Sequence, residues 1–387
     1  MLCLAIESSC DETSLCFLET NIQPSNSTVS FYDIINSCRI ISQVISSQID
    51  IHAQYGGVIP EIGARQHAEQ IHFLFEQIRQ EGQVDLSKLQ HIFVTNSPGL
   101  MSALRVGVEF ARSIQFFVEQ QYNTKVALTN VNHLQGHIAS CFLDLHNQNS
   151  SNNHKFQDTD IFPHLHLLVS GGNTQLRLLR SWTDWEIVGQ TLDDAVGEGF
   201  DKAGRMAGIA YPAGATLSRI AGNELSNSLD LPVSMLRSND CNFSFSGLKT
   251  AVRYKIQKSN IVGLELEKPL IEEELAILLG DSSLVDSQLN PKLTFVRQLC
   301  QSVNCVIMKQ ILNKLTMADK LYQPVSIGLS GGVSASPSLR NLVVQLAKTR
   351  PVFLPDKSLT GDNATMIGLS GVASLTQRLL TNATDFA

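Results

Sequence analysis

The sequence predicts an α/β protein built from two halves, and three observations lead to this prediction. The chain has 387 residues, which corresponds to two domains at about 150 residues each. A unit of strand, tight polar turn and strand occurs twice, within residues 1–19 and again within residues 164–179. Strand-like runs are followed by segments with apolar residues at three- and four-residue spacing, which is typical of α/β folds. The recurrence of one unit indicates an internal duplication.

The composition is that of an ordinary globular protein and excludes several functional classes. Hydrophobic residues make up 43% of the chain and charged residues 17%. No stretch approaches the roughly 20 uncharged apolar residues of a membrane helix, so we expect no membrane contact. The net charge of −7 means that any nucleic acid must be bound by a local basic patch or with the help of a partner. Eight scattered cysteines without a CxxC pair, and a strand pattern starting at Leu2, lead us to expect a cytoplasmic protein.

Both strand–turn–strand units have the same pattern of apolar strands around a polar turn, and polar segments interrupt the chain after them. The first unit reads LCLAI, ESSCDETS and LCFLE, and the second reads HLHLLV, SGGNT and QLRLL, so apolar strands flank a polar turn each time. Residues 21–30 and 147–160 are polar and aperiodic, which predicts loops or insertions. A further insertion is predicted at 258–289, where EKPLIEEELAILL indicates an acidic amphipathic helix.

Four helices bear on function. Pro60 suits the first turn of a helix that continues through Ile78. Asn132 is a predicted cap, with Gln135 completing a capping box, and further helices are expected over 193–207 and from Asp362 onward. We therefore expect a first half over 1–130 and a second half over 131–361, with the last helix, about 362–380, packing back on the first half.

The strongest chemical signal is the pair His133 and His137. At this spacing both imidazoles project from one helix face about 6 Å apart and can share one divalent ion. Unrelated histidines are the commoner explanation of a bare HxxxH, but this pair lies where a strand-like ALTNV enters a helix. A metalloprotease would need Glu after the first His, and the sequence is HLQGH. Asp11 and Asp362, both in short polar turns, are the candidates for a third ligand, although turn or helix capping would also explain each of them.

Glycine-rich turns and one basic segment supply the remaining candidates. Three turns follow strand-like runs, within LLVSGGNTQ (168–175), IGLSGGVSAS (327–336) and TNSPGLMSALRVG (95–107). Such turns can aim several N–H groups at one anion, which favours a nucleotide-like ligand held between two halves. Residues 243–255, FSFSGLKTAVRYK, combine alternating Phe with Lys249, Arg253 and Lys255. This segment is either a solvated basic face or a phosphate or RNA contact.

Together these motifs resemble the TsaD family of tRNA threonylcarbamoyladenosine synthases, once labelled O-sialoglycoprotein endopeptidases. The resemblance covers nearly the whole chain. It rests on nine motifs in order: ESSCDET (7–13), HAQYGGVIPE (52–61), NSPGL (96–100), NHLQGH (132–137), LVSGGNTQL (168–176), LDDAVGEGFDKAGRMAG (192–208), FSFSGLKT (243–250), GGVSAS (331–336) and GDNATMI (361–367).

The resemblance implies a fold, a reaction and a set of site residues. The fold would be two duplicated RNase H-like halves around a cleft, as in actin, Hsp70 and sugar kinases. The reaction would transfer a threonylcarbamoyl group from threonylcarbamoyl-AMP to the exocyclic amine of the adenosine 3′ of the anticodon, in tRNAs that read codons beginning with A. The implied metal ligands are His133, His137 and Asp362, and the ion would be Fe(II) or zinc, because imidazole favours softer ions than magnesium. The implied adenylate-binding residues are Leu168, Val169, Ser170, Gly171, Gly172, Asp201, Gly214 and Ser336.

Asp11 or Glu12 is expected to accept the proton as the amine attacks, a role assigned from their position in the acidic turn. The chain departs from the family pattern at five positions: Ser97, Gln135, Asn173, Ala213 and Ser336. The predicted metal ligands are retained, so the departures concern mainly the nucleotide contacts.

The resemblance also implies partners, and two rival functions stay open. Bacterial members act with a paralogous subunit and a small ATPase, whereas the mitochondrial type acts as a homodimer. A sugar or acetate kinase of the same fold would want a catalytic Asp and magnesium rather than a His pair. A noncatalytic homologue that binds nucleotide and a partner would not need His133, His137, Asp362 and Asp11.

Overall fold

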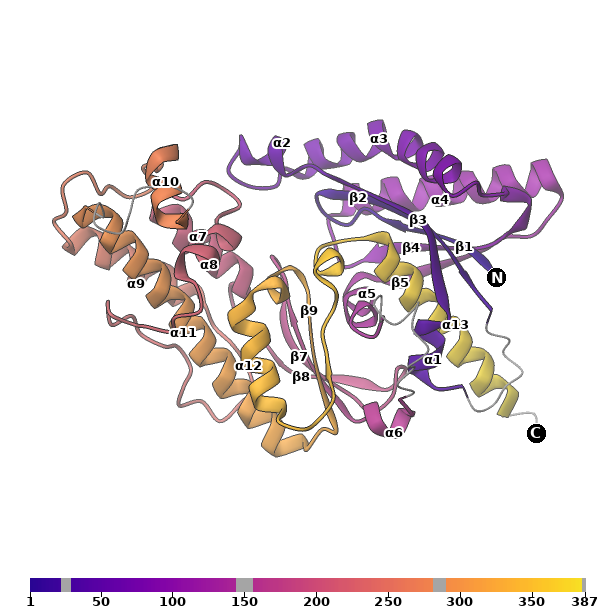
Figure 1. Ribbon diagram of the computed structural model, residues 1–387. Helices are drawn as coiled ribbons and strands as arrows, with labels where there is room; N and C mark the ends of the chain where they lie inside the picture. Colours follow the sequence, from indigo (N-terminus) through magenta and orange to yellow (C-terminus); the bar gives the residue numbers. More distant parts are fainter. Residues whose placement is uncertain (22–28, 144–155, 281–289, 385–387) are drawn as a thin grey trace.

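The computed structural model describes residues 1–21, 29–143, 156–280 and 290–384, and its described residues form two lobes, each with a five-stranded mixed sheet (Figure 1). In the first sheet the strands lie in the order β3-β2-β1-β4-β5. Their bounds are β1 Leu2–Glu7, β2 Glu12–Thr20, β3 Cys38–Ser47, β4 Leu89–Ser97 and β5 Ala127–Asn132. β1, β2 and β3 pair antiparallel, whereas β4 and β5 continue the sheet in parallel from β1.

The second sheet repeats this topology. Its order is β8-β7-β6-β9-β10, with bounds β6 His164–Val169, β7 Thr174–Leu179, β8 Trp185–Gln190, β9 Ser326–Ser330 and β10 Val352–Phe353. Again three strands form an antiparallel meander, and the last two extend in parallel from the first. Identical strand order and directions in both lobes confirm the predicted α/β fold with two duplicated, actin-like halves.

Helices cover both faces of the first sheet (Figure 1). The helix bounds are α1 Phe31–Asn36, α2 Ile49–Ala53, α3 Pro60–Glu81, α4 Met101–Tyr122, α5 His133–Ser140, α6 Asp158–Ile161, α7 Val196–Met206, α8 Ala213–Ala221, α9 Ser246–Lys258, α10 Glu272–Leu279, α11 Pro291–Tyr322, α12 Pro337–Ala347 and α13 Ala364–Thr384. Leu4 and Ile6 of β1 pack with α3 on one face, while Cys3 and Ala5 pack toward α13 on the other. Because both faces are covered, β1 is an almost unbroken apolar run.

The C-terminal helix α13 packs tightly against the first sheet. A Cβ atom at Gly368 would lie 2.5 Å from a Leu18 side-chain carbon, and one at Gly371 would lie 2.2 Å from Phe93. Only glycine therefore allows the helix to come this close to β2 and β4. This close approach fixes the segment just before α13, where Asp362 lies.

Some predicted elements differ from the structure. The helix expected over 193–207 begins at Val196, because the Asp193 carboxylate instead accepts hydrogen bonds from Ser244, Phe245 and Ser246. The acidic helix predicted in the 258–289 insertion is α10, while 281–289 and most of the 147–160 insertion lie outside the described residues.

The predicted division at residue 130 stays a prediction, and β5 continues to Asn132. Within the described residues we find no helix with the length and apolarity needed to cross a membrane.

Candidate functional site

Helix α5 carries two histidines that face the same point. The side chain of Asn132 caps this helix, because its Oδ1 accepts hydrogen bonds from the backbone N–H groups of Leu134 at 3.0 Å and Gln135 at 3.2 Å. His133 is the first helical residue, and His137 follows one turn later. Both rings are buried, with exposed fractions of 7% and 0%. The cap therefore fixes the direction in which both imidazoles point.

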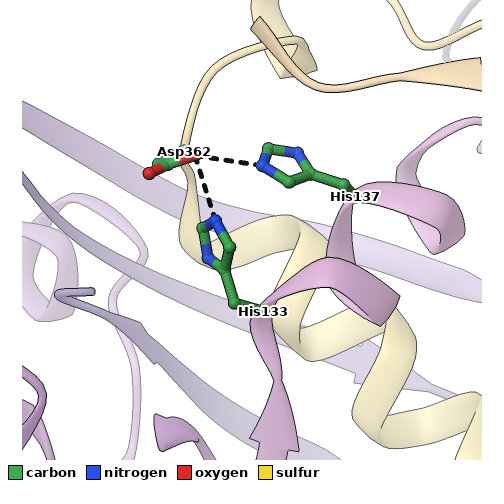
Figure 2. Close-up of side chains that lie close together, drawn as sticks. All are labelled: His133, His137 and Asp362. Atoms are coloured by element: carbon green, nitrogen blue, oxygen red, sulfur yellow. Dashed lines mark ion pairs between the residues drawn. The ribbon is translucent and has the colours of Figure 1, made fainter. Parts of the chain in front are cut away.

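Asp362 completes a three-residue cluster from the other end of the chain. Its Oδ1 lies 3.1 Å from Nε2 of His137 and 3.5 Å from Nε2 of His133. Figure 2 shows both rings, carried by one helix, pointing at the carboxylate on the segment that leads into α13. One ligand atom from each residue lies within 4.8 Å of the others. Two imidazoles and a carboxylate at this separation form a donor set that suits one divalent ion.

The surroundings of the buried His137 ring indicate whether a metal ion fits at this cluster. Its contact with Asp362 lacks hydrogen-bond geometry, and neither ring nitrogen has a hydrogen-bond partner among the described residues. A buried polar atom without a partner is costly, and a bound ion would satisfy Nε2. The residues present therefore fit a divalent metal ion.

The charges around the cluster favour a cation. Burial by itself would raise the pKa of Asp362, but the His133 and His137 rings lower it to about 2. Burial disfavours the charged form of His133, yet Asp362 and Glu7 raise its pKa to about 9. Two carboxylates thus flank one imidazole, so positive charge is stabilised at this point, whether as a proton or as a metal ion.

Glu7 is a residue of this site that the sequence reasoning missed. It is fully buried at the end of β1, and its Oε2 lies 3.1 Å from Nδ1 of His133. Thr95 donates to the same oxygen at 2.6 Å, and the Ser9 backbone N–H donates to Oε1 at 2.6 Å. A carboxylate that holds Nδ1 leaves Nε2 free to bind a metal. The sequence feature that could have identified Glu7 is its position as the one charged residue at the end of an apolar strand.

Asp11 ends the turn between β1 and β2, and Glu12 begins β2, where its carboxyl group is close enough to Asp362 to interact with it electrostatically. Burial raises the pKa of Glu12 to about 9, and the negative charges of Asp362 and Asp11 add to this rise. The Ser47 hydroxyl donates to Glu12 Oε1 at 3.4 Å. The two predicted acidic residues therefore belong to the same acidic cluster as the metal ligand.

A pocket of about 630 Å³ lies in the second lobe and contains four of the predicted nucleotide residues, Gly171, Asp201, Gly214 and Ser336. Asp201 Oδ1 accepts a hydrogen bond from the Gly214 N–H at 2.6 Å, which ties α7 to the start of α8. The hydroxyls of Ser218 and Ser336 lie 3.4 Å apart and join α8 to α12. The pocket is thus formed where three helices begin or meet, which suits an anionic, nucleotide-sized ligand.

Glycines allow the pocket walls to converge. A Cβ atom at Gly197, in the first turn of α7, would lie 2.6 Å from the Ser170 carbonyl oxygen. At Gly331, where φ is +88°, a Cβ atom would lie 2.3 Å from the Val169 carbonyl oxygen. A larger residue at Gly331 would push the ends of β6 and β9 apart, and one at Gly197 would push α7 away from the turn after β6.

The other predicted nucleotide residues occupy different environments. Leu168 and Val169 are fully buried in β6, so only their backbone groups could meet a ligand. Ser170 closes the turn after β6: its hydroxyl accepts from the Asn173 N–H at 3.1 Å, and its own N–H donates to the Asn173 carbonyl at 2.8 Å. Gly172 is exposed. None of these four lines the pocket.

Comparisons with known proteins identify the family of this chain. The family model described as "TsaD: tRNA N6-adenosine threonylcarbamoyltransferase" matches residues 39–369. Three curated proteins of that name are similar. The one from Anaeromyxobacter sp. (strain Fw109-5) is 33% identical over 96% of this chain and 93% of its own length. The one from Fervidobacterium nodosum is 32% identical over 96% of this chain and 93% of its own length. The one from Syntrophomonas wolfei subsp. wolfei is 33% identical over 95% of this chain and 90% of its own length. Since the family model covers residues 39–369 and these relatives match nearly the whole chain, the protein belongs to the TsaD family.

Proposed function

We propose that this protein transfers a threonylcarbamoyl group from threonylcarbamoyl-AMP to the exocyclic amine of the adenosine 3′ of the anticodon, in tRNAs that read codons beginning with A. The observation that carries the proposal is the convergence of His133 Nε2, His137 Nε2 and Asp362 Oδ1, in a chain whose second lobe holds a nucleotide-sized pocket. Membership of a family whose model and curated relatives carry this activity in their names supports it.

The proposed metal is Fe(II) or zinc, held by His133, His137 and Asp362, because two imidazoles favour softer ions over magnesium. When bound, such an ion supplies Lewis acidity that polarises an acyl carbonyl or neutralises a leaving phosphate. The buried Glu7 orients His133 for this role, and the capped start of α5 orients both rings.

The pocket would hold the adenylate part of the donor. Asp201, Gly214 and Ser336 would contact the nucleotide. In the turn after β6, Gly171 and Gly172 would present backbone N–H groups to the phosphate, while the Ser170 N–H, which donates to the Asn173 carbonyl, would hold the turn in shape. Leu168 and Val169, the last two residues of β6, would take part only through their backbone groups, which lead into that turn. A donor held in this way would lose the entropy of bringing the reactants together on binding rather than during the reaction.

An exocyclic adenine amine is a very weak base, so its proton must leave as the new bond forms. We assign acceptance of this proton to Asp11, which lies in the acidic turn. Glu12, at the start of β2, is the alternative, but its pKa of about 9 keeps it protonated at neutral pH, which favours Asp11. The bond between the acyl carbon and the phosphate oxygen then breaks, and AMP leaves with the electron pair.

A protein partner is also proposed, either a paralogous subunit with a small ATPase or a second copy of this chain. The supporting observation is a set of large apolar side chains exposed on α3 and α4, two helices that pack against each other. These are Phe73, 67% exposed, Phe116, 67% exposed, and Phe117, 49% exposed. Exposed aromatic residues on adjacent helices are typical of protein interfaces.

The test is mass spectrometry of nucleosides from an unmodified tRNA for an A-starting codon. The tRNA is incubated with this protein, threonylcarbamoyl-AMP and a bacterial set of partners, with His137→Ala in parallel. We expect threonylcarbamoyladenosine with the wild type and none with the variant. If the wild type binds metal and nucleotide but forms no product, it is a binding homologue rather than a transferase.

A further inference from the structure

Helix α9 is unusual among the surface helices because it carries several cations and no acid. Its sequence, SGLKTAVRYKIQK, contains Lys249, Arg253, Lys255 and Lys258. None of the four forms an ion pair with a described residue. Several cations on other helices are instead paired with nearby carboxylates: Arg65 with Glu69 on α3, Arg112 with Glu109 on α4, and Lys202 of α7 with Asp194. In a chain of net charge −7, four uncompensated cations on one helix mark a local binding surface for an anion.

The exposed half of α9 is arranged as two edges. Leu248, Val252 and Ile256 are buried on the inner side, which sets the opposite side toward solvent. At 3.6 residues per turn, Lys249 and Arg253 lie along one edge of the exposed half, about 6 Å apart along the axis. Tyr254, 58% exposed, and Lys258 lie along the other edge, with the Lys258 ammonium 6.0 Å from the Tyr254 ring. We call these four residues the α9 face.

The start of α9 is already occupied, so side chains rather than backbone N–H groups must make any phosphate contact. The Asp193 carboxylate accepts from the backbone N–H groups of Phe245 at 2.8 Å and Ser246 at 3.2 Å. It also accepts from the hydroxyls of Ser244 at 2.5 Å and Ser246 at 2.7 Å. These four hydrogen bonds hold the helix in place, so little ordering remains to be done when the α9 face binds.

The helix also packs directly on an element of the pocket. Phe245 lies at the N-terminal end of α9 and packs against Gly199 of α7. A Cβ atom added at Gly199 would lie only 3.3 Å from the Cβ atom of Phe245. The same α7 contributes Phe200 and Asp201 to the pocket. A large polyanion lying on the α9 face is thus held against the lobe that contains the nucleotide pocket.

We propose that the α9 face, Lys249, Arg253, Tyr254 and Lys258, binds the phosphate backbone of the RNA substrate, with Tyr254 stacking on an unpaired base. This inference rests on the proposed function, which makes an RNA the acceptor. RNA fits better than an acidic protein because an exposed aromatic ring between cations matches the way single-stranded RNA is bound, through charge along the backbone and stacking on bases.

The experiment measures binding of an unmodified tRNA transcript to the full-length protein at several salt concentrations. For Lys249→Glu/Arg253→Glu we expect at least a tenfold loss of affinity near 0.1 M salt. We also expect the slope of log K against log salt to fall by about 2, since two phosphate contacts are lost. The matched control Lys320→Glu/Lys348→Glu makes the same charge change on exposed residues outside α9 and should lose much less. Tyr254→Ala should weaken binding without changing the slope, and Tyr254→Phe should restore it.

Two further readouts separate this inference from the proposed function. Binding of AMP to the pocket should be unchanged in every α9 variant, which shows that the lobe remains folded. If wild-type protein modifies tRNA but Lys249→Glu/Arg253→Glu binds tRNA as the wild type does, the inference is wrong and the proposed function stands. If that variant instead loses a protein partner while keeping tRNA affinity, α9 is a protein interface and the inference is also wrong. If the wild type neither binds nor modifies tRNA, both the proposed function and this inference are wrong.

Discussion

Oε2 of Glu7 lies 3.1 Å from Nδ1 of His133, on the side of the ring opposite Asp362. The carboxylate fixes the tautomer and the rotation of an imidazole whose other nitrogen faces the candidate metal. Glu7→Gln should therefore weaken metal binding by about 10- to 100-fold while leaving the three ligands in place. Competition with a chromogenic zinc chelator measures this, with exposed Glu81→Gln as the control. Equal affinity in Glu7→Gln and the wild type would show that Glu7 only stabilises the fold.

The metal assignment predicts about one iron or zinc ion per purified chain. His137→Ala should lose this ion, because two donors bind far more weakly than three. Elemental analysis by mass spectrometry checks it, with the exposed His72→Ala as a matched control that should keep the ion. Full metal retention in His137→Ala would remove the site assignment.

The pocket should be separable from the metal site by mutation. Asp201→Ala removes the acceptor of the Gly214 N–H, so the start of α8 loses its tie to α7. We expect AMP affinity to fall by about tenfold, which equals about 1.4 kcal/mol, while metal content stays unchanged. Calorimetric titration with AMP measures this, and exposed Asp184→Ala should bind AMP as the wild type does. A parallel loss of metal would mean that Asp201 supports the whole fold instead.

Gly328 of β9 makes room for two buried histidines. A Cβ atom there would lie 2.5 Å from His164 Nε2 and 2.5 Å from His166 Nδ1. Gly328→Ala should therefore destabilise the protein by about 1–3 kcal/mol through overpacking. The midpoint of thermal unfolding reports this. Gly57→Ala, where an added methyl group would meet nothing within 4 Å, should leave the midpoint nearly unchanged.

The same histidines make a contribution to stability that is lost in mild acid. His164 donates to Ser326 and lies 3.1 Å from His166, which in turn contacts Ser330, all without exposure. Burial lowers the pKa of His164 from 6.5 to about 3 and that of His166 well below 6.5. Below pH 6.5 the unfolded chain therefore binds protons that the folded chain does not. The contribution of these two histidines to the free energy of unfolding therefore decreases as the pH falls, by about 1.4 kcal/mol per pH unit for each histidine. His133 and Glu12, whose pKa values are raised to about 9, contribute with the opposite sign, so the comparison with a His164 variant isolates the effect.

Thermal midpoints at pH 7.5 and 5.5 check this prediction. His164→Phe removes one titrating group, so its midpoint should drop less between the two pH values than that of the wild type. Parallel drops would show that other groups cause the acid sensitivity.

Much of the fold was predictable because it depends on local patterns. Apolar strands around a polar turn gave β1 and β2, and again β6 and β7, and the Asn132 cap gave the start of α5. The helix expected over 193–207 is present as α7, but its start was wrong for a non-local reason. The Asp193 carboxylate accepts hydrogen bonds from residues 244–246, more than fifty positions away in sequence, and the helix begins three residues later, at Val196.

The sequence by itself determined the duplicated α/β pattern and the spacing that puts His133 and His137 on one helix face, because backbone periodicity alone controls both. Only the tertiary structure decided that Asp362 meets those histidines, since α13 must pack through Gly368 and Gly371 onto strands from the opposite end of the chain. It also decided that Glu7 holds His133. An apolar strand ending in a carboxylate gives no sign of its partner until β1 and α5 are brought together, and burial then requires that the charge be paired.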